Sequence, residues 1–313
     1  MNKEKDFINI INKILNKDSG KEILVGIGDD AAVISKSNPD NTVICSDSIV
    51  EGVHFNTEYF SFENIGWKSI SINISDLASM GASPSYFTVS IGVPNNLNVE
   101  NFTKIIKGIE NCCINFGGKV IGGDIVSSDK LFISVTAIGT LISNNFMTRD
   151  SAKSGDKIAV TGNLGDSLGG LKLLKNNKNN KNLSEKHFSP KPKINQSREL
   201  INSGIECCMD ISDGLHNDLL NICRQSDVSM IVQVENIPIS KDLKKEFPDE
   251  YKDIAINGGE DYELLFTFDQ SKIKLNFDYH VIGEICKKSN YEIFYKNKNK
   301  KYLPNLNPWS HFE

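Results

Sequence analysis

The stretch Glu63–Met80 reads ENIGWKSISINISDLASM, and the run Tyr86–Val93, YFTVSIGV, follows it closely. In the first stretch, Ile70, Ile74 and Leu77 recur at three-to-four spacing, which predicts a helix with a buried stripe. The second is an apolar run rich in strand-forming residues, which predicts a strand. Helices and strands that follow one another in this way indicate a fold built from two packed layers.

Strand-like and helical runs alternate along the rest of the chain, and the mixture predicts an α/β (α+β) fold. The predicted strands are Thr42–Ser46, Tyr86–Val93, Lys119–Ile121, Leu131–Ile138, Lys157–Thr161, Ser229–Val234, Glu263–Phe268 and His280–Ile285. The predicted helices are Asp6–Leu15, Glu63–Met80, Val99–Phe116, Gly165–Lys175, Asn195–Ser203 and Gly214–Gln225.

A length of 313 residues suggests two domains. The polar, turn-rich stretch RDSAKSGD (Arg149–Asp156) comes directly before the predicted strand at Lys157. We therefore expect an N-terminal domain over 1–149 and a C-terminal domain over 150–313. The segment Leu174–His187 is rich in Asn and Lys, and we expect a solvated loop or a frayed helix end there.

Composition excludes several classes of protein. Hydrophobic residues make up 39% and charged residues 24%, which is ordinary for a folded chain, and the net charge of −5 argues against a nucleic-acid-coating protein. No run approaches the ~18 apolar residues of a membrane span. The seven cysteines form no CxxC pair, so neither a disulfide scaffold nor a zinc site is indicated. We expect a cytoplasmic protein that binds neither nucleic acid nor membrane.

The informative pattern is a set of aspartates beside Gly, Ser or other small residues. The stretches are GIGDDAAVI (Gly26–Ile34), SDSIVEGVHF (Ser46–Phe55), ISDLASMGA (Ile74–Ala82), IGGD (Ile121–Asp124), MDISDGL (Met209–Leu215) and NGGED (Asn257–Asp261). Each one alone fits an ordinary turn or helix cap. Together, carboxylates converging in one cleft would need a cation to stay ionised, and oxygen-only ligands favour Mg²⁺ or Mn²⁺. Spacing alone does not say whether the stretches converge.

Familiar nucleotide-binding signatures are missing, including the P-loop and the protein-kinase motifs. Arginine is scarce, with three Arg against 35 − 3 = 32 Lys, so Arg149 in the turn before the second half is a candidate phosphate ligand as well as a possible surface residue. A lone histidine such as His54 is more often a hydrogen-bonded structural residue. Trp309 could cap a core edge or stack on a ligand ring.

The ordered motifs resemble those of the thiamine-monophosphate kinases, a family of the aminoimidazole-ribonucleotide-synthetase-like ATP-binding superfamily. The resemblance runs from GIGDDAAVI to NPWSHFE (Asn307–Glu313) and includes TRDSAKSGD, TGNLGDSLGGL and NGGEDYEL. It implies an N-terminal mixed-sheet ATP-binding domain that forms the contact of a homodimer, and a C-terminal α/β domain. It also implies phosphorylation of thiamine phosphate to thiamine diphosphate, with ATP and several Mg²⁺ ions.

The resemblance also implies roles for particular residues. The implied metal ligands are Asp30, Ser46, Asp47, Asp76, Asp124, Asp210 and Asp213. The implied ATP contacts are Gly123, Asp124, Arg149 and Ser212, and the implied thiamine phosphate contacts are His54, Glu260 and Trp309. Asp47, Asp124 and Arg149 would be the catalytic residues.

Two positions depart from the family pattern. Cys45 stands where the family usually has a Thr or Ser that offers an oxygen to a metal, and a thiol is a poor Mg²⁺ ligand. A family tyrosine near the nucleotide has no counterpart, because its position falls near Ile106.

Other functions remain open from the sequence. A different enzyme on the same scaffold is one alternative, such as an amide-activating synthetase, a selenophosphate synthetase or a hydrogenase-maturation protein. The first cysteine, Cys45, lies in a predicted strand, and the chain ends in His-Phe-Glu, which disfavours the last two. A nucleotide or metal sensor without catalytic activity is the other alternative.

Overall fold

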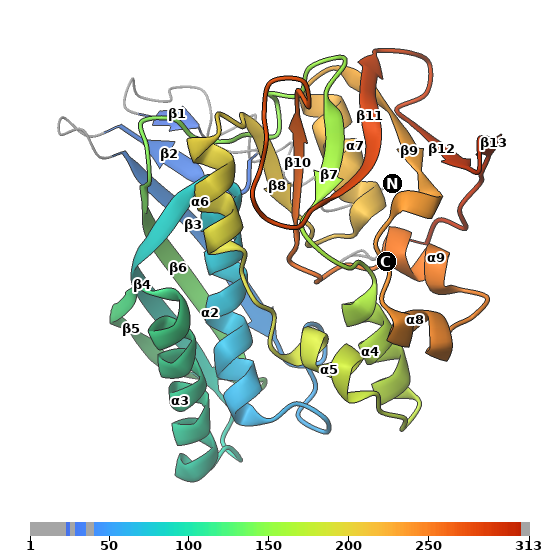
Figure 1. Ribbon diagram of the computed structural model, residues 1–313. Coiled ribbons are helices and arrows are strands. Elements are labelled where there is room, and N and C mark those ends of the chain that lie inside the picture. Colours follow the sequence, from blue (N-terminus) through green and yellow to red (C-terminus); the bar gives the residue numbers. More distant parts are fainter. Residues whose placement is uncertain (1–22, 26–28, 36–40, 308–313) are drawn as a thin grey trace.

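The computed structural model describes residues 23–25, 29–35 and 41–307. The predicted helix Asp6–Leu15 and Trp309 lie outside the described residues. Two β-sheets with their helices lie side by side, one from the first half of the chain and one from the second (Figure 1). The fold is thus the mixed α/β arrangement that the sequence predicts.

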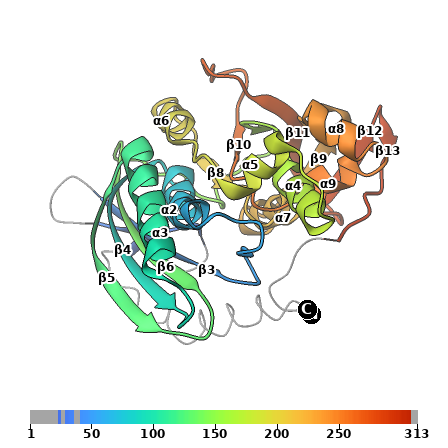
Figure 2. The same cartoon turned by 90° about the horizontal axis from the view of Figure 1, so that it is seen from below.

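The first sheet has the strand order β1-β2-β3-β6-β4-β5. Only β4 and β5 pair in parallel, and the other neighbours are antiparallel. The helices α2 and α3 lie on one side of this sheet (Figure 2). The elements are β1 (Ile23–Val25), β2 (Ala32–Ile34), β3 (Thr42–Val50), α2 (Phe62–Ser79), β4 (Ala82–Val93), α3 (Val99–Phe116), β5 (Lys119–Ser127) and β6 (Phe132–Leu141).

Helix α2 is the central helix of the molecule. Ser61 caps its N-terminus, because the Ser61 hydroxyl accepts a hydrogen bond from the Asn64 N–H at 3.1 Å. Most of its residues are buried, because α2 contacts its own sheet, α3, and also β8 and α6 of the second half. It can approach α3 closely because glycines meet there: a Cβ on Gly108 would lie 1.9 Å from the Glu63 carbonyl oxygen.

The second sheet has the strand order β13-β12-β9-β11-β7-β10-β8, with only β12 and β9 in parallel. Its strands are β7 (Lys157–Val160), β8 (Cys207–Asp210), β9 (Val228–Gln233), β10 (Leu264–Phe268), β11 (His280–Lys287), β12 (Ile293–Asn297) and β13 (Lys300–Lys301). Its helices are α4 (Asp166–Lys175), α5 (Lys181–Phe188), α6 (Ile194–Asn202), α7 (Leu215–Gln225), the 3-10 turn Val234–Asn236, α8 (Lys241–Glu246) and α9 (Tyr251–Asn257).

One sequence prediction is wrong in this half. The segment Leu174–His187 is not simply a solvated loop or a frayed end, because it contains most of α5. Asn180 caps this helix by accepting hydrogen bonds from the N–H groups of Asn182 and Leu183. Leu183 and His187 are buried, so one face of α5 is part of the core despite its polar composition.

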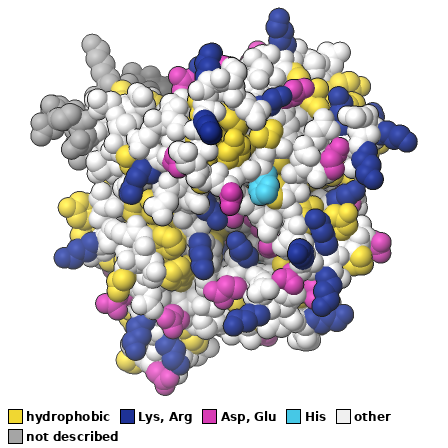
Figure 3. All heavy atoms as spheres, in the orientation of Figure 1, with side chains coloured by type: hydrophobic (Ala, Val, Ile, Leu, Met, Phe, Trp, Pro, Cys, Tyr) yellow, Lys and Arg dark blue, Asp and Glu magenta, His cyan; other side chains and the backbone are white. Residues whose placement is uncertain are grey.

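Lysines and acidic side chains are interspersed on the face shown in Figure 3, and they do not separate into regions of one sign. Within the described residues, no helix is both long and apolar enough to cross a membrane. All seven cysteines are free thiols.

Candidate active site

Three of the predicted metal ligands meet where the two halves of the chain touch. Asp30 precedes β2, Asp76 lies in α2 and Asp210 ends β8. Each offers one carboxylate oxygen, and these oxygens all lie within 4.8 Å of one another. The Ser75 hydroxyl donates a hydrogen bond to Asp210 Oδ2 at 2.5 Å and so ties α2 to β8. The fold therefore brings together aspartates from three distant motifs.

The chemistry of this carboxylate cluster fits a divalent cation. Asp30 Oδ2 and Asp210 Oδ1 are buried and accept no hydrogen bond from any described residue. Burial, together with the charge of Asp30, raises the pKa of Asp210 to about 8. Burial and the charges of Asp47 and Asp210 raise the pKa of Asp76 well above its usual range. A hard cation such as Mg²⁺ would satisfy these oxygens and remove the repulsion.

Arg149 is held against the same cluster. Its guanidinium forms an ion pair with Asp30, and its backbone N–H donates a hydrogen bond to Asp29 Oδ2 at 3.1 Å. Burial lowers the pKa of Arg149, but Asp30 and Asp29 raise it more, so the guanidinium is charged. The Ser226 hydroxyl donates to the Arg149 carbonyl at 2.8 Å and fixes the turn. Arg149 is therefore a part of the site and not a surface residue.

The β3 residues split between the two faces of their strand. Asp47 donates its backbone N–H to Asn73 Oδ1 at 3.0 Å and lines the large pocket described below. Side chains alternate along a strand, and the Ser46 hydroxyl donates instead to the Val135 carbonyl on β6 at 3.0 Å. The structure thus brings Asp47 to the cluster side and leaves the Ser46 side chain on the other face.

Cys45 lies buried beneath the cluster. Its thiol donates to the Asn73 carbonyl, with 3.4 Å between sulfur and oxygen. Burial and the charges of Asp76 and Asp47 raise the pKa of the thiol well above its usual range, so it stays neutral. A neutral thiol that is already hydrogen-bonded is not a Mg²⁺ ligand.

Gly123 and Asp124 lie elsewhere in the single chain. Both are on β5, the edge strand, which β4 and β6 separate from β3. Asp124 is exposed, and its Oδ1 accepts a hydrogen bond from the Ile125 N–H at 2.9 Å. The structure does not bring these two residues to the carboxylate cluster.

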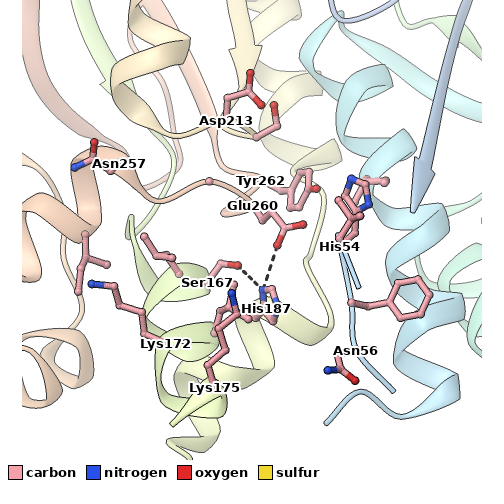
Figure 4. Close-up of a pocket in the computed structure, with 18 of the residues that line it drawn as sticks. His54, Asn56, Ser167, Lys172, Lys175, His187, Asp213, Asn257, Glu260 and Tyr262 are labelled. Carbon is pink, nitrogen blue, oxygen red and sulfur yellow. Dashed lines mark hydrogen bonds and ion pairs between the residues drawn. The ribbon is translucent and has the colours of Figure 1, made fainter. Parts of the chain in front are cut away.

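A pocket of about 970 Å³ opens beside the cluster, between the two halves of the chain. Asp47, His54, Ser212, Asp213 and Glu260 line it, so five predicted site residues share one cavity. Figure 4 shows that His54 lies on one wall and Glu260, His187 and Ser167 on another. Two lysines of α4, Lys172 and Lys175, also line this cavity.

The local contacts of His54 and Glu260 differ. His54 Nδ1 accepts a hydrogen bond from the Val50 N–H at 3.1 Å, which places the proton of a neutral ring on Nε2. The Glu260 carboxylate contacts Lys68 Nζ at 2.8 Å and His187 Nδ1 at 3.2 Å. His54 thus has the structural hydrogen bond expected of it and also lines the cavity.

Comparison with known proteins identifies the family. The chain matches the family models "AIR synthase related protein, N-terminal domain" over residues 28–141 and "AIR synthase related protein, C-terminal domain" over residues 153–296. It is 39% identical to the thiamine-monophosphate kinase of Buchnera aphidicola subsp. Schizaphis graminum, over 81% of this chain and 80% of that protein. It is 33% identical to that of Bacillus subtilis, over 92% of this chain and 94% of that protein.

The chain belongs to the thiamine-monophosphate kinase family. A solved structure of a family member, AaThiL complexed with AMPPCP and TMP, is 31% identical and superposes with a TM-score of 0.87. The match covers 99% of this chain and 97% of that one, so both halves and their relative placement are shared. This agreement confirms the two-part α/β fold expected from the resemblance.

Sequence reasoning missed four titratable residues around the candidate site of this chain. Asp29 binds Arg149, and burial together with Asp30 raises its pKa to about 6. Asp218 in α7 is fully buried, and neither of its oxygens accepts a hydrogen bond from a described residue. Lys68 and His187 hold Glu260. Asp29 stands in a quoted motif beside Asp30, whereas no sequence signal marks the other three.

Proposed function

We propose that this protein transfers the γ-phosphoryl group of ATP to thiamine phosphate, which yields thiamine diphosphate and ADP. One observation carries the proposal: three carboxylates converge beside a paired arginine. Asp47, whose charge acts on Asp76 of this cluster, lines a cavity large enough for a small phosphorylated compound. Family membership and the relative bound to AMPPCP and TMP support the same reaction.

The reaction needs no general base on the protein. The acceptor is a phosphate monoester with a second pKa of ~6, so it is mostly a dianion near neutral pH. The difficulty is to bring this dianion to the γ-phosphate, because two unit charges 4 Å apart repel by about 4 kcal/mol at an effective dielectric constant near 20. Catalysis then consists of alignment and charge neutralisation.

We propose that Asp30, Asp47, Asp76, Asp210 and Asp213 hold several Mg²⁺ ions, which when bound neutralise phosphate charge. Arg149, through a guanidinium whose charge Asp29 and Asp30 maintain, orients phosphate oxygens. Ser212, in the turn between β8 and α7, is a further proposed ATP contact. Gly123 and Asp124 lie away from the cluster of their own chain, so they would contact ATP from the second copy of the homodimer proposed below. The Ser46 hydroxyl faces away, so only its backbone is available on the cluster side.

The cavity is the proposed site for thiamine phosphate, with His54 and Glu260 on its walls. Trp309 remains a proposed contact from outside the described residues. We further propose that the domains divide at 149/150 and that the protein acts in the cytoplasm.

We also propose a homodimer formed through β5. This edge strand is exposed along its whole length and presents Val120, Ile121, Ile125 and Val126 to solvent. It borders an apolar groove of about 930 Å³ that α3 also lines. An exposed apolar edge strand is normally covered by another chain, and a second copy would supply a matching edge.

The direct test is ADP formation from Mg·ATP with and without thiamine phosphate, with the product identified as thiamine diphosphate. We expect ADP to form only when thiamine phosphate is present. Unphosphorylated thiamine is a control for the acceptor, and an amide and selenide are control acceptors for the alternative enzymes of this scaffold. Mg·ATP binding without phosphoryl transfer to any acceptor would instead indicate a sensor.

A further inference from the structure

We propose that Lys68 is a positioning residue for thiamine phosphate. Its buried ammonium group holds Glu260 and the backbone of His54 in place on two walls of the pocket, and His187 provides a second anchor for Glu260. This inference rests on the proposed function and refines it, because it names the residues that shape the acceptor site.

The surroundings of Lys68 are unusual for a lysine. It lies in the middle of α2, and its side chain has no exposed surface. Its Nζ atom contacts Glu260 Oε1 at 2.8 Å and donates a hydrogen bond to the His54 carbonyl at 3.2 Å. Nζ also lies 5.3 Å from the centre of the Phe60 ring, which adds a cation–π contact. A buried charge persists only when it is paired in this way.

Glu260 is held by contacts from several directions. Its φ of 62° is in the left-handed region, which a non-glycine residue keeps only when its surroundings enforce it. The Glu260 N–H donates to the Ser212 carbonyl at 2.8 Å. On the side-chain end, His187 Nδ1 lies 3.2 Å from Oε2 and 3.0 Å from the Ser167 hydroxyl (Figure 4). The carboxylate therefore has one defined position in the pocket.

The charges agree with this geometry. Burial would raise the pKa of Glu260, but Lys68 and His187 lower it well below its usual range. Burial and the charge of Lys68 lower the pKa of His187. At neutral pH the group is thus an ionised Lys68–Glu260 pair with a neutral His187. Removing the lysine would leave a carboxylate with one neutral anchor, free to move or to take up a proton.

The contacts of Lys68 also join the two halves of the chain. Lys68 and His54 belong to the first half of the chain, which forms the first sheet and its helices. Glu260 and His187 belong to the second half. The two walls of the acceptor pocket are therefore fixed relative to each other through one ammonium group. Within the described part of the chain, neither Asp76 nor Arg149 forms a hydrogen bond or ion pair with Lys68, Glu260 or His187. ATP and metal are proposed to bind at Asp76 and Arg149, so loss of Lys68 should affect the acceptor more than ATP.

The test is Lys68→Met, with Lys104→Met as the matched control, because Lys104 forms an exposed ion pair with Glu100 of the same helix, α3. We expect Lys68→Met to raise the KM for thiamine phosphate at least tenfold, while the KM for ATP and kcat change less than threefold. The Kd of thiamine phosphate, measured by calorimetry with Mg·AMPPCP present, should rise in parallel. A folded Lys68→Met protein with KM and Kd within twofold of the wild type would overturn the proposal.

A double-variant comparison shows whether the effect passes through Glu260. Lys68→Met should weaken the binding of thiamine phosphate by a smaller factor in the Glu260→Gln protein than in the wild type, because only the contact with the His54 carbonyl is then lost. Independent, multiplying effects would contradict the proposal. If Lys68→Met does not fold, the pair His187→Gln and His187→Leu replaces it. The His187→Gln side chain can still donate a hydrogen bond to Glu260, so the KM for thiamine phosphate should stay within threefold of the wild type. The His187→Leu side chain cannot donate, so the KM should rise. Equal KM values for the two variants would overturn the proposal.

Failure of this inference and failure of the proposed function give different results. A wild-type protein that forms no ADP with thiamine phosphate rejects the function. A wild-type protein that is active, beside a Lys68→Met protein with unchanged KM and Kd, rejects only the positioning role.

Discussion

Asp76 lies in α2, and most of the residues beside it in this helix are buried. One of its carboxylate oxygens lies within 4.8 Å of carboxylate oxygens of Asp30 and Asp210. Its surroundings raise its pKa well above the usual range, with burial as the largest cause. Such a position is unfavourable for an ionised carboxylate, so without a cation the group favours its protonated form, and a bound cation would compensate for the charge instead. The residue thus links the stability of the fold to the proposed chemistry.

Replacing Asp76 by Asn tests this link. We expect kcat to fall at least about a hundredfold, equivalent to ~2.7 kcal/mol of transition-state stabilisation, with partial recovery at high Mg²⁺. The same change should raise the melting temperature of the cation-free protein, because it removes a repelling carboxylate. Steady-state kinetics and thermal unfolding measure both effects. Asp129→Asn, on the exposed surface, is the control and should change neither kcat nor the melting temperature. A kcat above a tenth of the wild-type value in Asp76→Asn would contradict a cation-binding role for Asp76.

At the residue scale, the sequence indicated candidate site residues but not how their side chains meet. Asp30, Asp76 and Asp210 were each recognisable beside small residues. The contact between α2 and β8 brings Asp76 to Asp210, and Asp30, just before β2, completes the cluster. Side chains alternate along β3, and the Ser46 side chain therefore faces away from the carboxylate cluster. Which side chains face the cluster depends on the pairing of β3 with distant strands, and the local sequence does not show this pairing. Lys68 gave no signal, because its partner Glu260 is far away in the chain.

At the element scale, the packing of α2 against α3 depends on glycines. A Cβ on Gly66 would lie 2.0 Å from the Ile105 carbonyl oxygen, and one on Gly108 would lie 1.9 Å from that of Glu63. Both obstacles are backbone atoms, which cannot move without separating the helices. The two helices therefore fit together only with glycine at both positions.

Gly108→Ala should consequently destabilise the protein by about 2–3 kcal/mol, as overpacking does, although Ala is the better helix former. The matched control is Gly169→Ala in α4, where the obstacle is the end of the flexible Leu243 side chain, and there we expect a much smaller loss. Urea unfolding of both variants measures the difference. Equal stabilities would show that the helices can separate without cost.

The longer elements were predictable because strong local patterns define them. The predicted helix Glu63–Met80 corresponds to α2 (Phe62–Ser79), and the predicted strand Ser229–Val234 to β9 (Val228–Gln233). Helix α5 was not predicted, since its Asn and Lys residues hide the buried positions Leu183 and His187. Tertiary contact, and not local preference, makes this segment helical.

At the scale of the whole molecule, the exposed strand β5 predicts self-association. Ile121 is 56% exposed on this edge. Ile121→Lys should convert a dimer to a monomer, because it places a charge in the proposed interface. Sedimentation velocity measures the change, and Val99→Lys, at the exposed start of α3, is the control. A wild-type protein that sediments as a monomer would contradict the homodimer.

The cation requirement also belongs to the whole molecule, because the carboxylate cluster joins its two halves. In the native protein the pKa of Asp210 is raised to about 8, chiefly by burial, and that of Asp29 to about 6. Between about pH 4 and 8 the native state without cations therefore binds protons that the unfolded chain, with carboxyl pKa values near ~4, has released. Its stability should fall as the pH rises through this window.

The cation site is tested by thermal unfolding with and without Mg²⁺, at pH 5 and at pH 8. Without Mg²⁺ we expect a lower melting temperature at pH 8 than at pH 5. Mg²⁺ should raise it clearly more at pH 8, where the carboxylates would otherwise repel each other. A rise that is equal at the two pH values, or no rise at all, would contradict the claim that these aspartates form a cation site.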